Sequence, residues 1–160
     1  MNANVFLLLG TNMGDRNNNL VDALIAINQD VGIVRKKSSV YQTAAWGKTD
    51  QEPFYNQVIE LQTTLTPHQV LDALLSIEQK MGRKRTYLWG ERIIDIDILF
   101  YGDEIIETSD LIIPHTQLVH RRFTLLPLNE ISPDFIHPIF QKKVSELLQD
   151  CPDKLSVVKI

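Results

Sequence analysis

The chain has 160 residues, of which 44% are hydrophobic and 22% charged, so we expect one globular domain over residues 1–160. Its net charge of −4 argues against general nucleic-acid binding, and its positive charge lies in short clusters that suit a small anionic ligand better. The single cysteine excludes an internal disulfide. With no membrane-length apolar run and no leader pattern, we expect a cytoplasmic monomer without nucleic-acid or membrane partners.

The beginning of the chain predicts a strand followed by a helix. The apolar residues 5–9, ended by Gly10, are typical of a strand that is buried on both faces. Asp15 is the expected N-cap of a helix over residues 17–30, where apolar residues recur at helical spacing. The loop between them lacks the Gly-Lys-Ser/Thr ending of a P-loop.

Two more strands and a second helix follow. Residues 33–42 and 56–64 predict strands, and the long aromatic connection over residues 43–55 is typical of a binding loop. Thr66 as cap, Pro67 and a capping-box glutamine predict a helix that ends at Gly82.

Glu78 occupies an unusual place on the second helix. It falls on the same stripe as Leu71, Leu74 and Leu75, so its carboxylate should face the core or the edge of the sheet. Two interpretations of the Glu78 carboxylate stay open: a salt bridge to a nearby arginine, and service as a ligand near the loop that begins at Arg83.

The next stretch, residues 83–100, combines a basic loop with an alternating strand. In the strand over residues 94–101, Ile94, Ile96 and Ile98 should share one face, and Asp95 and Asp97 the other. Their backbones would be about 6.5–7 Å apart, which lets carboxylates converge on two divalent cations. An Asp-x-Asp pair alone is more often a solvated strand face than a metal site. Here the pair directly follows a loop that holds four cationic residues, suited to phosphate, and Trp89.

The remainder is less regular. Gly102 and Asp103 indicate a hairpin, and prolines, Pro127 among them, should break regular structure after Ile112. A short helix is expected near Val144. The order strand, helix, strand, strand, helix, strand predicts an α+β, ferredoxin-like βαββαβ fold: an antiparallel sheet with helices on one face and extra C-terminal elements. The two aspartates should then project beside the first strand.

Several motifs together resemble one enzyme family. They are Gly-Thr-Asn-Met-Gly-Asp from Gly10, Phe54-Tyr55-Asn56, Ile77-Glu78-x-x-Met81-Gly82-Arg83, Trp89-Gly90-x-Arg92, Asp95-Ile96-Asp97-Ile98-Leu99 and Pro114-His115. Over residues 10–127 the chain resembles 6-hydroxymethyl-7,8-dihydropterin pyrophosphokinases of folate biosynthesis. The resemblance implies transfer of pyrophosphate from ATP to the pterin hydroxymethyl group, with release of AMP.

The resemblance also implies roles for individual residues. Asp95 and Asp97 would bind two Mg²⁺ ions, and Arg83 and Arg92 would stabilise the phosphates. ATP would be bound by Glu78, Arg85, Trp89, Ile98, Ile112, His115 and Arg121. The pterin would be bound by Thr43, Trp46, Phe54, Asn56, Asp95 and Phe123, with the two phenylalanines sandwiching the ring.

Two alternatives remain open at this stage. Another two-metal enzyme on the same fold, such as a nucleotidyl transferase or cyclase, would release pyrophosphate and would not need Phe54, Asn56 and Phe123. A noncatalytic ligand-binding or regulatory module would need neither of the two aspartates for any activity. The general base is unassigned.

Overall fold

The computed structural model describes residues 2–44, 52–82 and 93–160. In chain order the elements are β1 (Ala3–Thr11), α1 (Arg16–Asp30), β2 (Ile33–Lys37), β3 (Tyr41–Thr43), β4 (Phe54–Thr63), α2 (Pro67–Met81), β5 (Asp95–Tyr101), β6 (Ile106–Glu107), β7 (Ile112–Ile113), the 3-10 helix η1 (Leu118–His120), α3 (Arg122–Ile131), α4 (Val144–Gln149) and β8 (Val157–Lys159). None of the described helices is long and apolar enough to cross a membrane.

The main sheet has the strand order β5-β1-β4-β3-β8, and β2 also pairs with β4. All of these pairs are antiparallel. Along the edge opposite β1, the ten residues of β4 accept two partners, because β2 pairs with the second half of β4 and β3 with its first. The predicted order from the first strand to the strand after the second helix is confirmed, except that three strands rather than two lie between the helices.

The single strand predicted over residues 33–42 is wrong, because Ser38 and Ser39 separate β2 from β3. The Ser38 hydroxyl accepts a hydrogen bond from the N–H of Val58, so a side chain replaces part of the strand ladder. The next residue turns toward α3, where its N–H and hydroxyl donate to Glu130. These long-range partners divide the segment into two strands.

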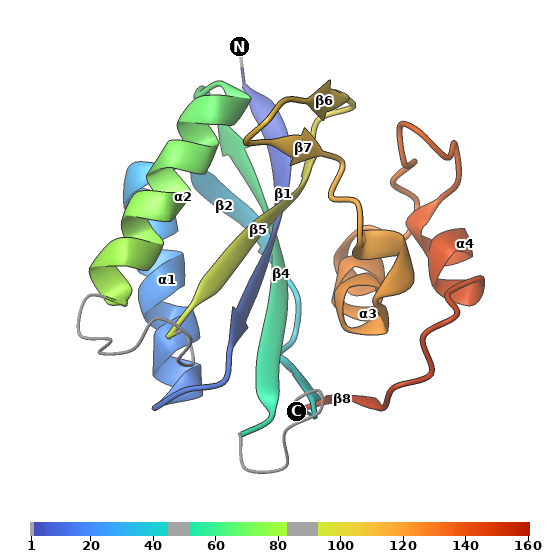
Figure 1. The fold of residues 1–160 in the computed structure, drawn as a ribbon, viewed down its shortest axis with the longest axis horizontal. Helices are drawn as coiled ribbons and strands as arrows, with labels where there is room; N and C mark the ends of the chain where they lie inside the picture. The colour runs from blue at the N-terminus through green and yellow to red at the C-terminus, as the bar shows by residue number, and fades with distance from the viewer. Residues whose placement is uncertain (1, 45–51, 83–92) are drawn as a thin grey trace.

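Helices cover both faces of the sheet (Figure 1). The two helices of the predicted βαββαβ unit share one face as expected, and the extra C-terminal helices cover the other. On one face Leu7 and Leu9 of β1 pack in a core with α1 and α2. On the other, Phe6 and Leu8 pack in a second core with α3 and α4. Pro127 lies inside α3, contrary to the expectation that it breaks regular structure. Its missing N–H removes one helical hydrogen bond, and burial of the helix against the second core offsets that loss.

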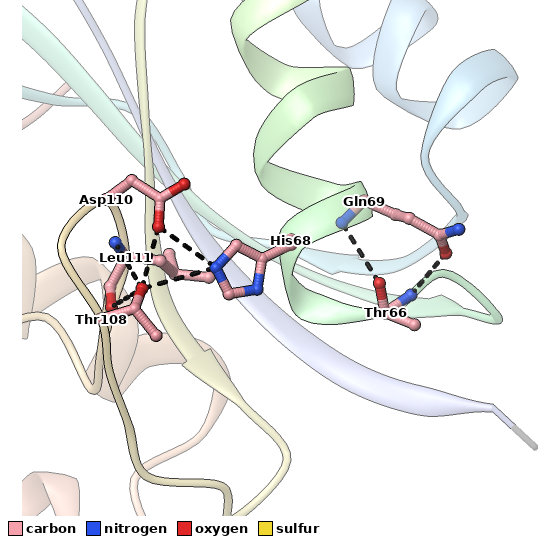
Figure 2. A network of polar contacts seen from close by, with 6 residues as sticks. All are labelled: Thr66, His68, Gln69, Thr108, Asp110 and Leu111. Carbon is pink, nitrogen blue, oxygen red and sulfur yellow. Dashed lines mark hydrogen bonds and ion pairs between the residues drawn. The ribbon is translucent and has the colours of Figure 1, made fainter.

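The helix caps agree with the sequence. Asp15 accepts from the N–H of Asn18 at the start of α1, and Thr66 and Gln69 form the capping box of α2 (Figure 2). The predicted apolar stripe of α2 is wrong in part, since Leu75 is 51% exposed. The buried stripe contains Val70, Leu74 and Ile77, which repeat at i, i+4 and i+7.

The predicted hairpin after β5 is also wrong. Gly102 does turn the chain, with a φ of 53°, but β6 pairs with β7 rather than with β5. The connection between β6 and β7 is closed by Thr108, whose N–H donates to the carbonyl of Leu111. Figure 2 shows His68 at the start of α2 beside Thr108 and Asp110, so this small hairpin lies against α2. The short helix expected near Val144 is confirmed as α4.

Candidate active site

A cavity of about 610 Å³ lies on the α3 side of the sheet. It is lined by Leu8, Gly10, Thr43, Ala44, Phe54, Asn56, Asp95, Asp97, Gln117, His120, Arg121, Phe123, Pro152 and Asp153. The strand register explains why the sheet residues meet: Gly10 pairs with both Asn56 and Asp95, and Thr43 pairs with Phe54. Directly opposed residues point to the same face, so one end of this face carries all of these polar side chains.

Gly10 makes room for the amide of Asn56. A Cβ atom placed on Gly10 would lie 2.9 Å from Oδ1 of Asn56, closer than real Cβ contacts allow. Asn56 is 4% exposed, so its amide is buried at the cavity wall. The glycine therefore fixes where a buried donor and acceptor face the cavity.

Asp95 and Asp97 enter the cavity from β5. Ile94, Ile96 and Ile98 are buried in the opposite core, so the predicted alternation is confirmed. The placement beside the first strand is confirmed too, because Asp95 pairs with Gly10 of β1. The described residues hold no group of three or more His, Cys, Asp or Glu side chains suited to a metal ion.

His115 approaches Asp97 from the loop after β7. Its Nε2 is 3.9 Å from Oδ2 of Asp97, which is too long for a hydrogen bond. Burial lowers the pKa of His115; the carboxylate of Asp97 raises it, and the guanidinium of Arg121 lowers it further. Nδ1 accepts from the N–H of Gln117 at 3.1 Å, so the neutral ring carries its proton on Nε2.

Two aromatic residues and a buried hydroxyl complete the cavity wall. Phe54 comes from β4 and Phe123 from α3, and both rings are half-buried. The guanidinium of Arg121 is 5.7 Å from the centre of the Phe123 ring. Thr43 is 4% exposed, and the described part of the chain offers its Oγ1 no hydrogen-bond partner. A buried hydroxyl of this kind is suited to a polar ligand.

Other residues predicted for ATP lie along the outer edge of β5. Oε2 of Glu78 accepts from the N–H of Ile96 at 2.6 Å, which confirms that this carboxylate faces the sheet edge. The N–H of His115 donates to the carbonyl of Leu99 near the other end of the strand. The structure does not bring Ile98 or Ile112 to the cavity: the first side chain is 6% exposed in the α1–α2 core, and the second is 48% exposed on β7.

Five predicted residues fall outside the described ranges: Trp46, Arg83, Arg85, Trp89 and Arg92. The cavity also contains residues that the sequence did not single out, among them Gln117, His120, Pro152 and Asp153. Gly10 carried a signal, because it opens a Gly-Thr-Asn motif after a buried strand. No sequence pattern indicated Pro152 or Asp153, because their position depends on the pairing of β8 with a strand that is distant in the sequence.

Two aromatic side chains, a buried amide and two carboxylates line the cavity, a combination that is suited to a flat, polar ligand. Comparison with known proteins agrees. The family described as 7,8-dihydro-6-hydroxymethylpterin-pyrophosphokinase (HPPK) matches residues 6–133. The chain belongs to this family.

Two relatives carry the same enzyme name, 2-amino-4-hydroxy-6-hydroxymethyldihydropteridine pyrophosphokinase. That of Aquifex aeolicus is 42% identical over 90% of this chain and 89% of its own length. That of Bacillus subtilis is 41% identical over 82% of this chain and 79% of its own. The crystal structure of Plasmodium falciparum HPPK-DHPS A437G with SDX-DHP has a TM-score of 0.77 at 20% identity, which supports the fold. The match covers 93% of this chain and 45% of that one.

Proposed function

We propose that this chain transfers pyrophosphate from ATP to the hydroxymethyl group of 6-hydroxymethyl-7,8-dihydropterin, giving AMP and the pterin methyl diphosphate in folate biosynthesis. Family membership supports the reaction. One observation supports the location: residues expected to bind pterin and metal come from four separate elements and line a single cavity. They are Thr43, Phe54, Asn56, Asp95, Asp97 and Phe123.

The pterin ring would lie between Phe54 and Phe123. A flat heterocycle gains from offset stacking on aromatic faces, and these two rings enter the cavity from the sheet and from α3. The amide of Asn56 offers both a donor and an acceptor, which matches the amide-like edge of a pterin. The unpartnered hydroxyl of Thr43 offers a further polar contact from the same wall. We assign the β1-to-β5 framework that positions these residues to the ferredoxin-like fold.

Asp95 and Asp97 are suited to Mg²⁺. This ion prefers oxygen ligands and is usually held by one or two carboxylates together with substrate phosphates, so a carboxylate pair that the described residues do not extend to a group of three fits it. We propose two ions here, whose charge would neutralise the triphosphate. The role of the strand is to hold both carboxylates on the cavity side, because the intervening Ile96 is anchored in the opposite core.

ATP would extend from the cavity along the outer edge of β5. Glu78 and His115 lie at this edge, and Arg121 brings a permanent positive charge to the cavity. Since its pKa is lowered, His115 is neutral at pH 7 and can donate from Nε2. Because the side chain of Ile98 is buried, a contact with ATP would involve its backbone. The roles of Ile112 and of five residues outside the described ranges stay predictions from the family resemblance. The five are Trp46, Arg83, Arg85, Trp89 and Arg92.

We further propose that residues 1–160 act as one catalytic domain, as a monomer in the cytoplasm. Incubation with Mg²⁺, ATP and the pterin should give AMP and pterin diphosphate in equal amounts. Omission of the pterin should abolish AMP formation. Release of inorganic pyrophosphate without AMP would instead indicate a nucleotidyl transferase or cyclase, and no product from folded protein would refute enzymatic activity of either kind.

A further inference from the structure

The start of α3 is capped by a residue from the C-terminal segment. Arg121 is the N-cap of α3 but makes no capping hydrogen bond with its side chain. The N–H of Arg122 instead donates to Oδ2 of Asp153 at 3.0 Å, across 31 positions of sequence. Arg121 and Phe123, on either side of this N–H, both line the cavity, so the cap acts on the turn that forms the cavity wall.

Asp153 is itself held in a defined orientation. Its Oδ1 accepts from the N–H of Leu155 at 3.0 Å, so its two carboxylate oxygens bond to two different segments. A few residues later β8 pairs with β3, where Val157 lies opposite Thr43. The segment between α4 and β8 therefore connects the α3 wall of the cavity to the strand that carries Thr43 (Figure 1). Pro152 and Asp153 themselves form part of the lining.

We propose that Asp153 is a positioning residue for the pterin cavity, an inference that rests on the proposed function. By capping α3, which begins at Arg122, it fixes the first turn and thereby the direction in which Phe123 enters the cavity. A negative charge at the N-terminus of a helix also interacts favourably with the positive end of the helix dipole. The ring of Phe123 must lie at stacking distance from a ligand on Phe54, so a frayed first turn should weaken pterin binding. The residues matched by the family end at 133, well before this segment.

The experiment compares three variants in the full chain. Asp153→Ala removes both acceptor oxygens, and Asp153→Asn keeps one acceptor for the two N–H donors of Arg122 and Leu155. Asp150→Ala is the matched control, because Asp150 lies in the same segment but pairs on the surface with Lys142. Calorimetric titrations with 6-hydroxymethylpterin and with a non-hydrolysable ATP analogue give the two affinities separately. Turnover of the unaltered chain tests the proposed function independently.

We expect Asp153→Ala to weaken pterin binding about fivefold, the ratio expected for loss of a helix cap, while the affinity for the ATP analogue changes less than twofold. Asp153→Asn, with one acceptor for two donors, should bind the pterin with an affinity between those of the unaltered chain and Asp153→Ala, and Asp150→Ala should bind as the unaltered chain does. Unchanged pterin binding in Asp153→Ala would overturn the proposal, as would equal losses of affinity for the two ligands. If Asp153→Ala does not fold, Asp153→Glu, which shifts the carboxylate by one methylene, takes its place with the same expectations.

Discussion

Replacement of Gly10 by alanine should impair the substrate site without destabilising the sheet. The new Cβ atom would meet Oδ1 of Asn56 at 2.9 Å, and the backbone at Gly10 has an ordinary negative φ that alanine adopts without strain. The amide, as the end of a side chain, must therefore turn away. Since each neutral hydrogen bond contributes about 0.5–1.5 kcal/mol, loss of both amide contacts should weaken pterin binding by about 5- to 150-fold. Stability should change by less than about 1 kcal/mol.

A double-mutant cycle tests this reasoning. Pterin affinity is measured by calorimetry for Gly10→Ala, Asn56→Ala and the double variant, and stability by urea titration for each. If Gly10 acts through Asn56, the glycine substitution should add almost no loss once the asparagine is gone. Fully additive losses would show that the glycine acts elsewhere. A large drop in stability with normal affinity would refute the geometric explanation.

Three further predictions follow from other parts of the structure. Asp97→Asn should lower kcat about a hundredfold or more, because the carboxylate acts in pyrophosphate transfer, while pterin affinity stays within a few-fold of that of the unaltered chain. Equal losses of kcat in steady-state kinetics and of pterin affinity in titrations would contradict this. Glu130→Ala should lower the melting temperature by a few degrees in thermal scans, because Glu130 accepts hydrogen bonds from Tyr41 at 2.7 Å and from Ser39. Burial lowers the pKa of His137, and its Nδ1 accepts from the N–H groups of Ile139 and Phe140, so the folded state favours the neutral ring. Stability should thus fall as pH drops below about 6.5, and urea titrations at pH 7 and 5 should show a smaller difference for His137→Gln.

Local patterns predicted much of the framework. The alternation of Ile94, Ile96 and Ile98 with aspartates identified β5 and both of its faces, because side chains on a strand follow a period of two regardless of distant contacts. The capping box at Thr66 located the start of α2 for a similar reason, since its bonds join residues three positions apart. The edge position of Glu78 also followed from helical spacing.

Features that depend on distant partners were not predictable in this way. Ser38 divides a strand because Val58 lies beside it, and Pro127 is accommodated in α3 because the second core covers that helix. Most site residues were assigned from the resemblance to a family rather than from periodicity, and the register then explains how they meet. Asp153 stayed hidden because neither source covers the C-terminal segment.

The outer edge of β5 has a consequence for association between chains. An edge strand offers unpaired N–H and C=O groups to which another strand can add, and long bare edges promote aggregation. Here the carboxylate of Glu78 accepts a hydrogen bond from the N–H of Ile96, and the N–H of His115 donates one to the carbonyl of Leu99. A strand from a second molecule would have to displace both. The contacts that frame the proposed ATP site thereby also protect the chain against edge-to-edge polymerisation.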